Sequence, residues 1–73
     1  FGDDVLINST EKLYFNDTSQ FIQGSSATVL SIGATDEIDL TATTIDINGA
    51  VALNGAITGA TNITLSGELV MQI

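Results

Sequence analysis

The sequence predicts an all-β protein: an elongated, repetitive β shaft with a less regular β part on its N-terminal side. Over segment 45–57, apolar or glycine positions alternate with polar or small ones, which in an extended chain sends the two sets to opposite faces. Strands in compact domains average about 5–6 residues, so a longer alternation broken by glycines indicates a chain that keeps running in one direction. The β-branched and aliphatic residues that dominate the composition favour strands.

The size and composition of the chain favour assembly from several copies. A lone chain of 73 residues buries too little surface to be comfortably stable. Disulfides, a bound metal or oligomerisation are the usual remedies. The sequence contains no Cys and no His, which excludes disulfides and thiolate metal sites and leaves oligomerisation as the expected remedy.

The charge of the chain excludes several kinds of partner. Nine acidic residues stand against one basic residue, Lys12, for a net charge of −8. Nucleic-acid phosphates and anionic membrane surfaces are therefore poor partners. No apolar run is long enough to predict a membrane span.

Residues 1–27 are predicted to form an irregular β region or shoulder. Short strands are expected at 5–7, at 12–16 and at Phe21-Ile22, with turn clusters at 8–10 and 16–19. A small meander of hairpins is one arrangement of these strands. The sequence starts without Met and stops within a pattern, and we expect it to be a fragment of a longer protein.

Residues 28–73 are predicted to form the repetitive β shaft. Apolar residues occupy even positions from Leu30 to Ala42 and odd positions from Ile45 onward. A change of parity turns every following side chain over, so we expect a corner or bulge at Thr43-Thr44 that keeps the apolar face inward.

A degenerate repeat runs through this segment. Its unit is two apolar residues flanking a polar one, followed by a small residue, and it starts at positions 38, 45, 51 and 63. Asn-Gly or Ser-Gly closes most units, and these residues accept the left-handed backbone that corners require. The apolar positions of the repeat predict the core of a trimer: Ile45, Ile47, Val51, Leu53, Ile63 and Leu65.

Two other architectures fit the same pattern. Asn48-Gly49 and Asn54-Gly55 also suit two-residue hairpin turns, and a single-chain β-solenoid or meander would use them in that way. Such short strands would leave apolar edges exposed to aggregation. Three identical chains wound about one axis, as an interwoven β-helix or β-prism, remove these edges because each free edge meets another chain.

No catalytic, cofactor-binding or metal-binding residue is predicted, and the chain is not expected to be an enzyme. The carboxylates cluster at 3–4 and 36–39, but a shaft offers no cleft for paired acid–base chemistry. Carboxylates at a seam between chains are an alternative Ca²⁺ site, with Asp39 and Asp46 the first candidates. The aromatic residues Tyr14, Phe15 and Phe21 suit a small core or, alternatively, a stacking platform for a sugar.

Several segments of the chain resemble the low-complexity shaft regions of bacteriophage tail fibres and tail spikes. The segments are 11–17, 38–42, 45–50 and 59–69, with sequences EKLYFND, IDLTA, IDINGA and GATNITLSGEL. The resemblance implies a homotrimer with interwoven β shafts, located on the virion tail and therefore extracellular. It also implies other tail proteins as partners and contact with a host surface through regions outside this chain.

The sequence also leaves a second function class open. A β-rich adhesin or carbohydrate-binding module that works alone on a cell surface would have the same composition. It would be a monomer that binds glycans through Tyr14 or Phe21. The number of chains in the particle separates these two functions.

Overall fold

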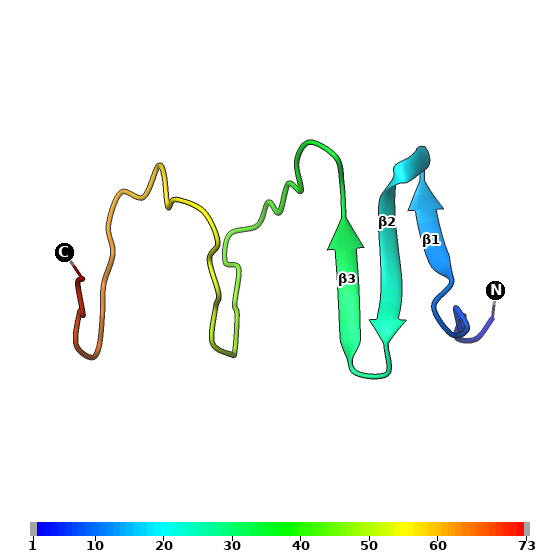
Figure 1. The fold of residues 1–73 in the computed structure, drawn as a ribbon, viewed down its shortest axis with the longest axis horizontal. Helices are drawn as coiled ribbons and strands as arrows, with labels where there is room; N and C mark the ends of the chain where they lie inside the picture. Colours follow the sequence, from blue (N-terminus) through cyan, green and yellow to red (C-terminus); the bar gives the residue numbers. More distant parts are fainter. Residues whose placement is uncertain (1, 73) are drawn as a thin grey trace.

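The computed structural model of the chain describes residues 2–72 and is all-β. Its three strands are β1 (Lys12–Phe15), β2 (Asp17–Ser26) and β3 (Val29–Gly33). They pair in chain order as an antiparallel sheet, β1-β2-β3 (Figure 1). No helix occurs among the described residues.

The turn between β1 and β2 is very short and depends on its polar residues. Asn16 adopts φ 69°, a left-handed conformation that Asn tolerates better than most residues. The next residue, Asp17, accepts hydrogen bonds through Oδ1 from the backbone N–H of Ser19 at 2.9 Å and from its hydroxyl at 2.6 Å. The register between the strands shifts between Tyr14 and Phe15, which lets this abrupt reversal occur.

The structure confirms some of the predicted strands and changes others. The strand predicted at 12–16 is present as β1, and Phe21-Ile22 lies in the middle of the much longer β2. The strand predicted at 5–7 is wrong, because that segment pairs with no other. The predicted boundary between residues 27 and 28 falls in the turn from β2 to β3, so the sheet includes residues from both predicted regions.

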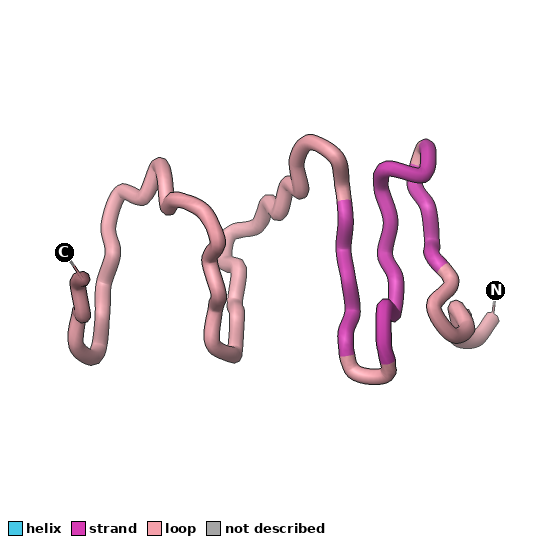
Figure 2. The backbone as a smooth tube through the Cα atoms, viewed as in Figure 1, coloured by secondary structure: helices cyan, strands magenta, loops and turns pink. Residues whose placement is uncertain are grey.

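From Ala34 to Gln72 the described chain forms no strand and makes no ladder with itself. It rises and falls as a series of extended stretches joined by bends (Figures 1 and 2). Bends occur at Thr43, Gly49, Gly55 and Ser66-Gly67, where corners were predicted, and also at 35–36, 59 and 61.

The left-handed backbone predicted for these corners is absent from all of them. In segment 34–72, only Gly59 has a positive φ, at 75°. Gly49, Gly55 and Gly67 turn the chain without it, and a Cβ built on any of them meets nothing within 4 Å. Within one chain, therefore, neither backbone strain nor crowding requires glycine at these three corners.

Residues 2–72 form no hydrophobic core of their own. No residue in the described part of the chain is buried. The radius of gyration is 16.8 Å, whereas a compact domain of this length has one of roughly 11 Å. The surface area is 7325 Å², whereas a folded monomer of 7.6 kDa exposes about 4,300 Å². The excess, about 3,000 Å², is surface that a stable protein of this size removes from water.

Candidate assembly surface

The two faces of the sheet differ in what covers them. Strand pairing aligns Lys12 with Gln23, Tyr14 with Phe21, and Phe21 with Gly33, so these side chains share one face. On β2 and β3 the residues of this face are partly covered, whereas Ile22, Leu30 and Ile32 on the opposite face are exposed. We call it the covered face; its members are Lys12, Tyr14, Phe21, Gln23, Ser31 and Gly33.

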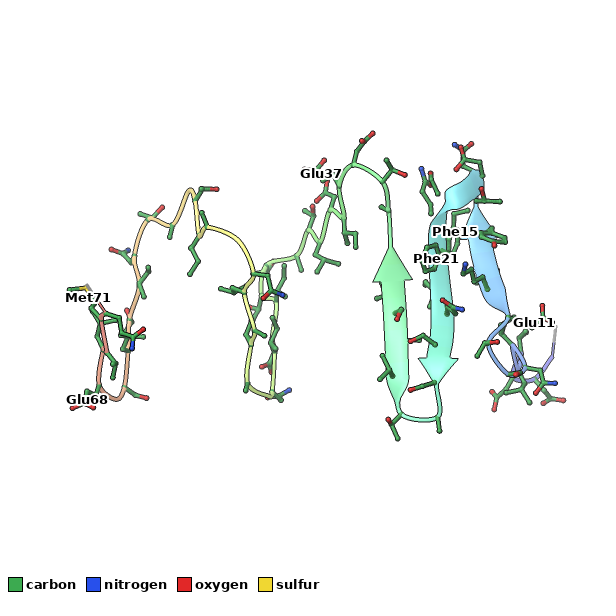
Figure 3. The ribbon with its side chains drawn as sticks, viewed as in Figure 1. Glu11, Phe15, Phe21, Glu37, Glu68 and Met71 are labelled. Carbon is green, nitrogen blue, oxygen red and sulfur yellow. The ribbon has the colours of Figure 1, made fainter. Side chains whose placement is uncertain are left out.

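Contacts within the chain account for the covering. The ring of Phe21 lies across Gly33, so close that a Cβ at this glycine would be 2.5 Å from Cζ of the ring. The Nζ atom of Lys12 lies 4.8 Å from the centre of the Phe21 ring and 5.9 Å from that of Tyr14, which is cation–π geometry (Phe21 is labelled in Figure 3). The only basic residue of the chain is therefore held against aromatic rings.

Hydrogen bonds complete this face. Nε2 of Gln23 donates to the backbone carbonyl of Thr10 at 2.9 Å, which ties the segment before β1 to the central strand. The hydroxyls of Ser25 and Ser31 share a hydrogen bond of 2.8 Å. On this face Nε2 of Gln23 and the hydroxyl of Ser31 thus have partners within the chain, whereas Tyr14 remains 47% exposed.

The opposite face is apolar and bare. Leu13 pairs with Ile22 and Ile22 with Ile32, which makes a row of aliphatic side chains across all three strands. Leu30, paired with Gly24 one step along the strands, extends the row. We call these residues, Leu13, Ile22, Leu30 and Ile32, the aliphatic face. They are between 36% (Ile22) and 68% (Leu30) exposed, which reverses the usual preference of a sheet for burying its aliphatic side.

The residues predicted to form a trimer core are exposed in the single chain. Their exposed fractions range from 51% to 67%, so at least half of each residue is open to solvent (Figure 3 draws the side chains). They lie on stretches between the bends, on a backbone that makes no ladder within the chain: Ile45, Ile47, Val51, Leu53, Ile63 and Leu65. Both their side chains and their backbone groups are therefore available to other chains.

The carboxylates of the described residues form no metal site within one chain. Oδ1 of Asp39 accepts a hydrogen bond from the hydroxyl of Thr41 at 2.7 Å. Among residues 2–72, no three acidic side chains come close enough together to hold a metal ion. The Ca²⁺ alternative at Asp39 and Asp46 therefore requires carboxylates contributed by more than one chain.

An open hollow of about 340 Å³ lies beside β1. Tyr14, whose side chain is 47% exposed, forms part of its wall, and polar groups form the rest. The cation–π contacts hold Lys12 at its edge. The hollow could accept a polar ligand that stacks on the ring, as the sugar-platform alternative requires. Its lining residues are Ser9, Thr10, Glu11, Lys12, Tyr14 and Gln23.

The aliphatic face was not predicted from the sequence. The sequence does contain one signal for this face: Ile22, Leu30 and Ile32 all occupy even positions. It does not reveal which residue of β1 lies opposite which residue of β2, because the register depends on the turn at Asn16 and on the bulge beside it.

Comparison of the chain with protein-family models, with curated proteins and with solved structures found no match in any of the three. None of the described segments forms a helix long and apolar enough to cross a membrane.

Proposed function

We propose that this chain is a structural segment of a bacteriophage tail fibre or tail spike, in which three copies form a shaft that displays a host-recognition tip. The proposal places the segment on the virion tail, outside the host cell. Its partners are two further copies of itself and other tail proteins, and contact with the host surface is made by regions outside this chain. The role is mechanical, with no enzymatic step.

The observation that carries the proposal is the area that the single chain leaves exposed. If three chains each cover an excess of about 3,000 Å², each of the three pairwise interfaces of a trimer buries about 3,000 Å² in total, within the range of about 2,000–5,000 Å² for obligate interfaces. Most of the exposed large apolar residues are Ile, Leu and Val, and they are spread along almost the whole described chain. A chain with this surface gains stability only by sharing an interior with other chains.

The backbone supports the same proposal. Segment 34–72 is extended but pairs with no other described residue, so its backbone N–H and C=O groups have no backbone partner within residues 2–72. Ladders between copies would satisfy them and would also remove the free edges that make exposed strands prone to aggregation. The bends at 43, 49, 55 and 67 allow each copy to contribute short stretches in turn to a common core.

A stand-alone adhesin or carbohydrate-binding module is the second candidate. The hollow beside Tyr14 favours it, since the ring offers an exposed stacking surface next to polar groups. It requires a chain that is stable as a monomer, which a structure without any buried described residue does not favour.

The molar mass of the full chain in solution tests the proposal. Sedimentation equilibrium over a range of concentrations should give three times the chain mass of 7.6 kDa. A folded monomer at all concentrations would refute the shaft and, together with binding of a glycan at Tyr14, would establish the second candidate.

A further inference from the structure

Two asparagines of the chain stand directly before a glycine: Asn48 before Gly49 and Asn54 before Gly55. Both asparagines are exposed. The backbone N–H groups of the two glycines donate to no backbone acceptor within residues 2–72. Both glycines also have open space around them, since a Cβ built on either meets nothing within 4 Å. A side-chain amide, an unpaired backbone nitrogen and the space for them to meet are thus all present at these two corners.

These are the requirements for a reaction between an asparagine and the residue that follows it. The backbone N–H of the following residue loses its proton to solvent base, and the nitrogen attacks Cγ of the asparagine. The C–N bond of the side-chain amide then breaks, and ammonia leaves with a proton from solvent. Water opens the resulting succinimide ring at either carbonyl, which gives aspartate or isoaspartate. The net reaction consumes water and releases ammonia, and nothing is oxidised or reduced.

We propose that Asn48 and Asn54 are sites of spontaneous deamidation in the single chain, and that assembly of the shaft protects them. The protection rests on the proposed self-assembly, whereas the reactivity of the single chain does not. A glycine N–H that donates to a carbonyl of another copy keeps its proton, and a corner packed between copies does not rotate to close the ring. The reaction therefore distinguishes assembled from unassembled chains.

Asn62 provides an internal comparison. It is also exposed, and the residue after it, Ile63, likewise donates to no backbone acceptor within residues 2–72. The branched Cβ of isoleucine crowds the attacking nitrogen and stiffens the residue, whereas glycine has no Cβ. Asn48 and Asn54 should therefore react at least about tenfold faster than Asn62, which corresponds to about 1.4 kcal/mol in the barrier.

The products change the segment that carries the predicted trimer core. Each event replaces a neutral amide by a carboxylate in a chain that already carries a net charge of −8. Isoaspartate also takes the main chain through the side-chain carbon, which lengthens the backbone and shifts the following residues relative to a partner strand. The reaction therefore limits how long an unassembled chain keeps the sequence that the shaft requires.

Mass spectrometry of the full chain tests both halves of the inference. The chain is incubated in neutral and in mildly alkaline buffer, with and without urea, and sedimentation equilibrium gives the molar mass of each sample without urea. Fragmentation of the intact chain assigns each event to one asparagine. In urea, Asn48 and Asn54 should react faster than Asn62 and faster at the higher pH. In an oligomer both should react at least about tenfold more slowly than in urea, as expected for sites that react only after local opening.

The possible results separate this inference from the proposed function. An oligomer protected at both positions supports the inference. An oligomer that reacts as fast as the chain in urea overturns the protection and leaves the shaft in place. A monomer that reacts as fast as the chain in urea overturns the shaft and supports the two sites, and a protected monomer overturns both. Equal rates at Asn48, Asn54 and Asn62 in urea overturn the sites, whatever the molar mass.

Two variants test the role of the glycine nitrogens. In Gly49→Ala and Gly55→Ala the new Cβ has open space, and neither glycine has a positive φ, so the single chain accommodates both changes. In urea, Gly49→Ala should slow the reaction of Asn48 and leave that of Asn54 unchanged, and Gly55→Ala should do the reverse. Unchanged rates at both asparagines in both variants would overturn the assignment of the attacking atom and, with it, the inference.

Discussion

Replacing Leu53 by Asp should prevent assembly of the chain. Leu53 is 60% exposed in the single chain. Covering the rest of such a side chain contributes about 1–2 kcal/mol per copy, because full burial of a Leu is worth about 1.5–3 kcal/mol. For three copies the loss is about 3–5 kcal/mol, which lowers the association constant by roughly 10²–10⁴. The new carboxylates add a desolvation cost of several kcal/mol for each charge placed in the interior.

The neighbouring substitution Asn54→Asp is the matched control. It adds the same charge one residue further along, on the polar register of the alternating segment. Sedimentation equilibrium of the two variants beside the unmodified chain should show a monomer for Leu53→Asp and an unchanged oligomer for Asn54→Asp. Oligomers of equal mass and equal stability from both variants would refute the assignment of Leu53 to a shared interior.

Two further predictions concern the sheet and its first turn. Gly33→Ala should displace the Phe21 ring, because the new Cβ would lie 2.5 Å from Cζ, and should destabilise the sheet by about 1 kcal/mol, the low end for overpacking, since the ring is not buried and has room to move. Gly55→Ala is the control, because the space around its new Cβ is open. It should alter the near-ultraviolet circular dichroism of the aromatic residues much less than Gly33→Ala does. Equal changes from the two variants would contradict the contact between Phe21 and Gly33. The hydrogen bonds from the Ser19 hydroxyl and backbone N–H lower the pKa of Asp17 below its ordinary value of 3.8. Because the pKa of Asp17 is lower in the folded turn, its charged carboxylate stabilises the turn at pH values above 3.8, and this stabilisation is lost as the pH falls below 3.8. The Ser19 amide signal in an NMR titration should therefore change with a midpoint under 3.8. A midpoint at or above 3.8 would remove the basis for the effect.

The alternation of apolar and polar residues correctly predicted an all-β chain with no helix among its described residues. It also located the bends at Thr43, Gly49, Gly55 and Ser66-Gly67, because a change of parity or a small residue after an apolar pair marks a place where an extended chain turns. The backbone conformation at these bends was not predictable in the same way. Only Gly59 is left-handed in this segment, since corners with open space around them have several backbone solutions.

The sheet required the three-dimensional structure. Val5-Leu6-Ile7 has the composition of a strand, but among the described residues no strand pairs with it. The residues of β2 on both sides of Phe21-Ile22 are mostly polar, yet they form a strand because β1 and β3 pair with them. Strand pairing is an interaction between distant residues, and local composition does not specify it.

Composition and period were enough to predict that this chain is β-rich and acidic, with many apolar side chains, because these properties depend on the kind and order of side chains. Which surface of the sheet stays open was decided by the register between strands, which placed Phe21 over Gly33 on one side and aligned Leu13, Ile22 and Ile32 on the other. A shift of one residue in that register would exchange the two faces, and such a shift leaves the sequence pattern unchanged.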